Sequence, residues 1–60
     1  MKRYMFEVDY TTDIERFFSL DDARRFARTK RFAIIYKLTF DGPRVITSEK
    51  MDTYKNGKVR

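Results

Sequence analysis

The sequence contains no cysteine and no histidine, and it has only two glycines and one proline among 60 residues. Without cysteine there is neither a disulfide framework nor a thiolate nucleophile, and without histidine there is no imidazole base and no His-ligated metal. A Gly-rich phosphate loop is also excluded, because Gly42 and Gly57 both stand in turn contexts. These absences remove most mechanisms open to small enzymes, so we predict a non-enzymatic protein without a metal or cofactor.

Long hydrophobic runs are missing as well. No fully apolar run exceeds a few residues, which is too short for a transmembrane helix or the core of a signal peptide. We therefore expect a cytoplasmic protein with no membrane contact. The carboxylates Asp9, Asp13 and Glu15 surround a predicted hairpin tip, where exposure argues against acid–base catalysis. Ser19 has no general base at a recognisable spacing.

Aromatic side chains are abundant instead, with six Phe and four Tyr. Folding must offset about 1.5 kcal/mol of conformational entropy per residue, and each buried ring removes about 150–250 Å² from water. These rings are more than one helix on one sheet can hide. We therefore expect some of them at the surface or in an interface, and a homodimer is one way of covering them.

Hydrophobic periodicity predicts four strands. Residues 3–10 alternate apolar and polar side chains, which is typical of a strand with one apolar face. Residues 14–18 follow a short polar turn and are predicted to pair antiparallel with them. Residues 32–40 form the strongest strand, which we place at the centre of the sheet. Residues 44–48 follow the Pro-containing turn at 41–43 and are predicted to pair antiparallel with the central strand.

A helix is predicted over residues 19–30. Ser19 is a suitable N-cap, and Asp22 stands where a capping box has its acid. The spacing of the apolar residues gives this helix one buried stripe. The stripe consists of Leu20, Ala23, Phe26 and Ala27.

The predicted fold is therefore α+β, with the order ββαββ and an antiparallel sheet of about four strands carrying one helix on one face. The domain covers residues 1–48, and residues 49–60 form a polar, basic C-terminal tail. Asn56-Gly57 is a typical hairpin turn, but only three residues follow it, so we expect the tail to fray.

The face of the central strand expected beneath the helix carries Phe32, Ile34, Tyr36, Leu38 and Phe40. The predicted core contains Phe6, Val8, Phe26, Ile34, Tyr36 and Leu38.

The net charge of +5 is unevenly distributed. Residues 1–22 hold three basic and six acidic side chains, whereas residues 23–60 hold eleven basic and three acidic ones. On a helix, Arg24, Arg28 and Arg31 fall at i, i+4 and i+7 and form one stripe. Arginine forks suit phosphates and carboxylates. A solvated helix face, complementary to the helix dipole, explains the same arginines without any ligand.

Two functions fit these patterns. The first is a basic module that binds nucleic acid through phosphate contacts of the Arg-rich helix and the tail. The alternative is a small protein-binding regulator or inhibitor, of a phage or accessory type, that binds an acidic surface of a host protein. Arg and aromatic residues support this alternative, because both are common in interface hot spots. The candidate binding residues are Arg24, Arg28, Lys30, Arg31, Lys50, Lys55 and Lys58, with Arg60 as a further cation of the tail.

Arginine next to aromatic rings, as in Arg31, Phe32 and Tyr36, also suggests a stacking platform for single strands. Such a platform requires the rings on the open face of the sheet. The expected position of Phe32 and Tyr36 beneath the helix argues against it.

Overall fold

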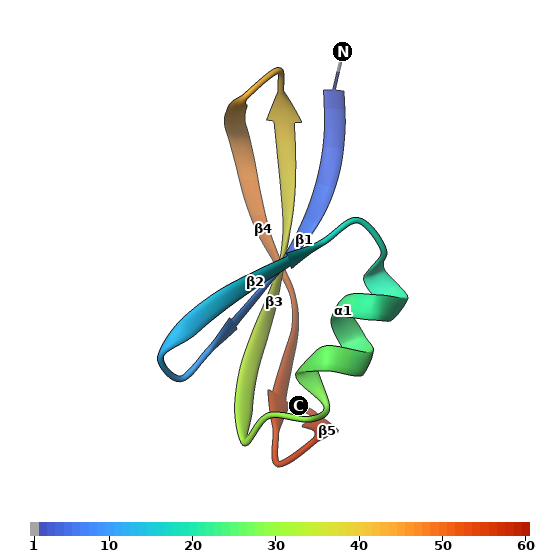
Figure 1. The fold of residues 1–60 in the computed structure, drawn as a ribbon, viewed down its shortest axis with the longest axis vertical. Helices are drawn as coiled ribbons and strands as arrows, with labels where there is room; N and C mark the ends of the chain where they lie inside the picture. Colours follow the sequence, from blue (N-terminus) through green and yellow to red (C-terminus); the bar gives the residue numbers. More distant parts are fainter. Residues whose placement is uncertain (1) are drawn as a thin grey trace.

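A computed structural model describes residues 2–60, which form one antiparallel sheet and one helix. The sheet has the strand order β2-β1-β3-β4-β5, with α1 between β2 and β3 in the chain (Figure 1). This arrangement confirms the α+β class, the antiparallel sheet and the central position of β3. The sheet has five strands rather than about four, and the element order is ββαβββ. The elements are β1 (Lys2–Tyr10), β2 (Asp13–Phe17), α1 (Leu20–Ala27), β3 (Phe32–Asp41), β4 (Arg44–Lys55) and β5 (Lys58–Val59).

The fifth strand lies in the segment that the sequence analysis assigned to a frayed tail. β4 continues to Lys55, and Asn56 and Gly57 then reverse the chain with φ angles of 54° and 81°. Positive φ at both central residues is the geometry that an Asn-Gly hairpin turn favours. The amide of Arg60 donates to the carbonyl of Thr53 at 2.7 Å and extends this hairpin. The prediction of a frayed tail was therefore wrong, although its turn had been recognised.

Helix α1 is shorter than predicted because its last turn tightens. The Oγ atom of Ser19 accepts a hydrogen bond from the amide of Asp22 at 3.4 Å, which confirms the predicted N-cap. Beyond Ala27, the amides of Thr29 and Lys30 donate to carbonyls three residues earlier, as in a 3₁₀ turn. The helix therefore ends at Ala27 instead of continuing to residue 30.

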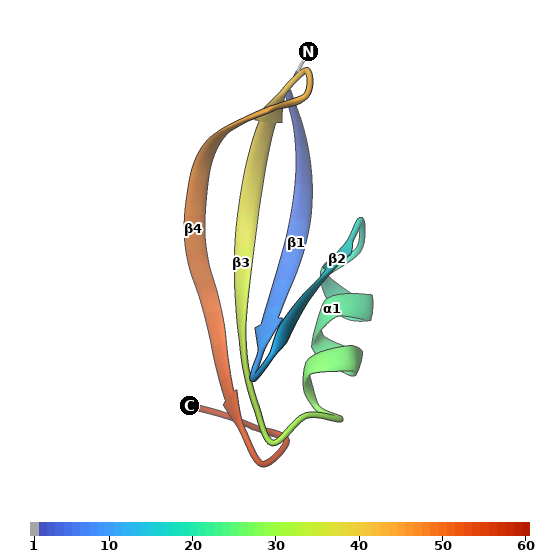
Figure 2. The same cartoon turned by 60° about the vertical axis from the view of Figure 1, so that its left-hand side comes forward.

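The core lies between α1 and one face of the sheet. Figure 2 shows α1 beside β2 at one end of the sheet, while the other ends of β1, β3 and β4 extend beyond the helix. Because two alanines of α1 point into this core, the helix backbone can approach the sheet closely. The buried cluster consists of Val8, Ala23, Ala27, Ala33, Ile35 and Tyr54.

The structure reverses the predicted orientation of β3. Val8 is the register partner of Ile35, and Ala33 is the partner of Tyr54. Directly opposed residues share a face, so Ala33 and Ile35 lie on the face that α1 covers. The alternate residues of β3 point to the opposite face, which we call the uncovered face. Its β3 residues are Phe32, Ile34, Tyr36, Leu38 and Phe40.

The predicted core is accordingly only partly correct. Val8 and Leu38 are buried as predicted, but Leu38 is buried on the uncovered face next to its partner Met5. Ile34 and Tyr36 lie partly exposed on that face and do not belong to the core beneath α1. Phe6 and Phe26 are half-buried and pack against the core cluster.

Candidate nucleic-acid-binding surface

Arg24 holds α1 against β4. Its Nε atom donates to Oδ2 of Asp52 at 3.0 Å, and the hydroxyl of Tyr54 lies 3.4 Å from the same oxygen. The hydrogen bond with Asp52 raises the pKa of the Arg24 guanidinium above its usual value, although partial burial opposes the shift. Of the predicted stripe, Arg24 is therefore paired within the fold, whereas Arg28, the C-cap of α1, and Arg31 beyond it are exposed.

Lys30 is also used within the fold. Its Nζ atom lies 4.6 Å from the ring centre of Tyr10 and 4.7 Å from that of Phe26. A cation over an aromatic ring is attracted to the negative face of the ring. The half-buried Lys30 therefore covers the edge of the core rather than extending freely into water.

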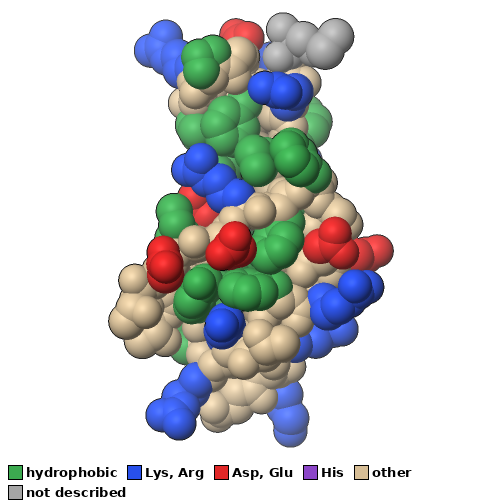
Figure 3. Space-filling view, viewed as in Figure 1, with side chains coloured by type: hydrophobic (Ala, Val, Ile, Leu, Met, Phe, Trp, Pro, Cys, Tyr) green, Lys and Arg blue, Asp and Glu red, His purple; other side chains and the backbone are tan. Residues whose placement is uncertain are grey.

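Five other basic side chains gather at one end of the molecule, where α1 ends and the β4–β5 hairpin turns. They come from the end of α1, the connection to β3 and the β4–β5 hairpin, and Figure 3 shows basic side chains projecting from this end. None of them forms an ion pair with a carboxylate side chain within residues 2–60. We call this group the basic end, and it consists of Arg28, Arg31, Lys55, Lys58 and Arg60.

Two backbone contacts fix the basic end. The amide of Asn56 donates to the carbonyl of Arg31 at 2.7 Å. A Cβ atom at Gly57 would lie 3.0 Å from the carbonyl oxygen of Arg28, so the hairpin lies directly against the end of the helix. A hollow of about 430 Å³ follows the hairpin, lined by Lys55, Asn56, Lys58, Val59 and Arg60.

The basic end continues onto the uncovered face. Lys55 is the register partner of Phe32, and Lys58 is the partner of Lys55, so all three share this face. Further along β4, Lys50 is the partner of Tyr36. Each of these two rings therefore has a lysine as its direct neighbour on β4. This pairing could not be predicted from the sequence, because register across strands cannot be read from the spacing within one strand.

Carboxylates lie on the other side of β3, on β1. Glu7 accepts a hydrogen bond from Nε of Arg16 at 3.1 Å, and the Arg16 guanidinium lies 5.9 Å from the ring centre of Phe40. Burial, and next the hydrogen bond with Glu7, raise the pKa of Asp9 above its ordinary value of 3.8. The Oδ1 atom of Asp9 is buried without a hydrogen-bond partner in the described chain. On the uncovered face, β1 thus places Glu7 and Asp9 beside Tyr36 and Ile34, with Arg16 paired to Glu7, whereas β4 and β5 carry lysines.

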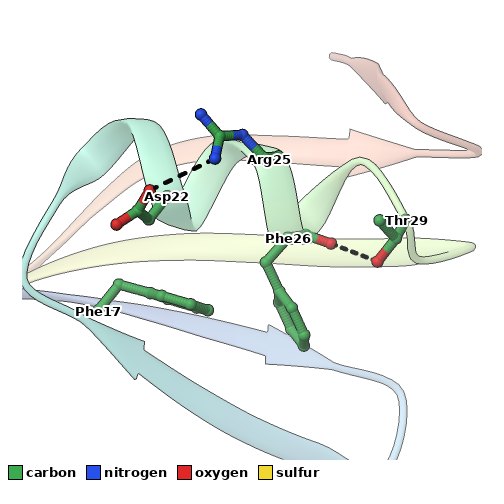
Figure 4. Close-up of a pocket in the computed structure, with 5 residues that line it drawn as sticks. All are labelled: Phe17, Asp22, Arg25, Phe26 and Thr29. Carbon is green, nitrogen blue, oxygen red and sulfur yellow. Dashed lines mark hydrogen bonds and ion pairs between the residues drawn. The ribbon is translucent and has the colours of Figure 1, made fainter.

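A second hollow, of about 330 Å³, lies beside α1 (Figure 4). The rings of Phe17 and Phe26 line it with centres 5.3 Å apart. Its polar groups already have partners, because Asp22 pairs with Arg25 at 3.8 Å and Thr29 Oγ1 donates to the carbonyl of Phe26 at 2.6 Å.

A third hollow, of about 160 Å³, lies at the far end of the uncovered face. Phe18 borders it with 79% of its surface exposed. Its lining residues are Arg3, Met5, Phe18, Phe40, Gly42 and Pro43.

Other kinds of site find little support in the described chain. Residues 2–60 contain no group of three carboxylate, thiol or imidazole side chains placed to hold a metal ion. No helix in this range has the length and apolar character needed to span a membrane. Comparisons with protein-family models, with curated proteins and with solved structures find no match.

Proposed function

We propose that the protein is a small, non-enzymatic nucleic-acid-binding module that holds phosphates at the basic end. The observation that carries this proposal is the meeting of five cations from three chain segments, none with a carboxylate side-chain partner among the described residues. Unpaired Arg and Lys side chains bind phosphates by displacing condensed counterions, which supplies most of the affinity for any sequence. Phosphate contacts also set the orientation of the bound chain.

The contributions of the candidate residues differ. Arg28 and Arg31 offer guanidinium forks, which match two phosphate oxygens at once. Lys55 and Lys58 add point charges on the adjoining hairpin. We assign no phosphate contact to Arg24 or Lys30, because Asp52 and two aromatic rings already occupy their charged groups.

The test is a salt titration of binding to a labelled duplex and a labelled single strand, followed by fluorescence anisotropy. In the triple variant Arg28→Gln, Arg31→Gln, Lys58→Gln, the slope of log K against log salt should flatten by about two to three units for the duplex, since each lost contact removes about 0.9. Lack of binding to both nucleic acids by the wild type at about 50 mM salt would refute the proposal.

A matched control removes three charges elsewhere. Lys2 and Arg44 flank Asp41 at the opposite end of the sheet, and Lys37 lies in the middle of β3. Replacing these three by Gln changes the net charge as much as the first variant does. It should leave the slope nearly unchanged, and an equal flattening would show that total charge, not the basic end, drives binding.

A protein-binding regulator is the second candidate, favoured by the exposed apolar side chains of the uncovered face. Phe18 is the most exposed large hydrophobic residue of the described chain, and it borders a hollow beside Met5 and Phe40. A complex held by such a surface should resist moderate salt, whereas phosphate binding weakens steeply. The salt titration therefore separates the two candidates.

A further inference from the structure

We propose that the nucleic acid is single-stranded and that its bases stack on Phe32 and Tyr36 of the uncovered face; this inference rests on the proposed function of the basic end. Bases of a single strand expose their flat faces, and aromatic side chains on an open sheet can stack against them. In a duplex the same faces are covered by neighbouring base pairs. The uncovered face therefore discriminates between the two forms, whereas the basic end binds both.

The rings of Phe32 and Tyr36 lie on the open face of the sheet, as a stacking platform requires. The register of β3 turns Phe32 and Tyr36 away from α1, and Phe32 keeps 44% of its surface exposed. The two rings are four positions apart along β3, which corresponds to about 13 Å. Ile34 lies between them on the same face and supplies an apolar floor.

The lysines of β4 and β5 determine where the phosphates run. Lys55 lies opposite Phe32 and Lys50 opposite Tyr36, so each ring has a cation on the same side. On the β1 side of β3, the partner of Tyr36 is Glu7, whose carboxylate is paired with Arg16, so this side offers the two rings no free cation. A bound strand should therefore follow the β3–β4 side of the face, and Lys55 joins this path to the basic end.

The free edge of β4 does not offer an equivalent site. Its register with β3 shifts between Ile35 and Tyr36 and again between Thr39 and Phe40, which leaves Met51 and Ile46 without partners in the ladder. Bulges of this kind bend an edge strand and disfavour pairing with an added strand. The unoccupied surface suited to a ligand is thus the face of the sheet rather than its edge.

The decisive variant is Phe32→Ala, compared with the wild type for binding to a thymidine 20-mer and to a duplex of the same length. Loss of one stacking ring should weaken single-strand binding roughly five- to hundredfold. Duplex binding should stay unchanged, because it depends on the basic end. Tyr4→Ala is the matched control: Tyr4 is a half-exposed ring on the other face of β1, beneath Nζ of Lys37 at 4.3 Å, and its loss should change neither affinity.

A measurement on the wild type covers the case in which Phe32→Ala fails to fold. In NMR titrations with the thymidine 20-mer, the ring signals of Phe32 and Tyr36 should shift, while those of Tyr4 stay in place. The inference would be overturned if folded Phe32→Ala bound single strands as tightly as the wild type, or if the ring signals of Phe32 and Tyr36 did not shift. Either result would leave phosphate binding at the basic end intact. A dimer in sedimentation that Phe32→Ala abolishes and that single strands do not displace would overturn it too.

Discussion

Tyr54 is the largest fully buried side chain of the described residues, with 1% of its surface exposed. Its ring fills the space between α1 and the sheet, while its hydroxyl remains near the carboxylate of Asp52. Burial is the main reason that the pKa of Tyr54 lies above its usual value. Its burial could not be predicted from the sequence, because Tyr54 is a single aromatic residue in a polar segment without hydrophobic periodicity.

Replacing Tyr54 by Ala should therefore destabilise the protein severely. Truncation of a fully buried aromatic residue costs about 3–5 kcal/mol, which is comparable with the total stability of a small domain. Phe26→Ala should cost less, since Phe26 is only half-buried. Urea denaturation followed by circular dichroism checks both variants, and a larger loss in Phe26→Ala would contradict this assignment of the core.

At the scale of the elements, alternation within single strands predicted β1, β2 and the central strand β3, and the capping residues predicted the start of α1. The orientation of β3 could not be predicted in this way. Residues 32–40 carry apolar side chains on both faces, since Ala33 and Ile35 alternate with Phe32 and Ile34. Only the packing of the alanines of α1 against Ala33 and Ile35 decides which face is covered.

The candidate site was predictable to a lesser degree. The sequence identified the cations of the tail and grouped Arg24 with Arg28 and Arg31, but it could not show that Arg24 is paired with Asp52. The pairing of Arg24 with Asp52 joins residues 28 positions apart. No local pattern encodes such a contact, because it depends on the path of β4 past the helix.

The β4–β5 hairpin gives a prediction at the same scale. Gly57→Ala should destabilise the protein, because φ is 81° and the added Cβ would lie 3.0 Å from the carbonyl oxygen of Arg28. Gly42→Ala is the matched control, since φ is 62° there but no atom lies within 4 Å of the added Cβ. Thermal melting should show the larger loss for Gly57→Ala. Equal losses would mean that backbone strain alone, not the contact with α1, is responsible.

The whole molecule measures 36 × 21 × 16 Å, and α1 covers only part of its length (Figure 1). Beyond the helix, β1, β3 and β4 form an open three-stranded section, in which Met5, Leu38 and Ser48 lie side by side. Such a section has fewer buried contacts than the core beneath α1. Stability should therefore differ along the sheet.

Amide hydrogen exchange measures this difference. Within the sheet ladders, amides of Lys2–Met5 and of β4 near Ser48 should exchange faster than those of Val8 and Ile35, whose side chains are fully buried. NMR at low protein concentration gives the rates residue by residue. Uniform protection along the sheet would contradict this expectation and indicate that the open section is covered in solution.

The position of Tyr54 in the chain also bears on how the protein acquires its structure during synthesis. The core beneath α1 is completed by a ring that emerges from the ribosome after all of β1, β2, α1 and β3. The contact of β5 and its turn with the end of α1 comes later still. A nascent chain that has reached only residue 53 therefore lacks its largest core side chain, and the core beneath α1 cannot be complete before Tyr54 has been added.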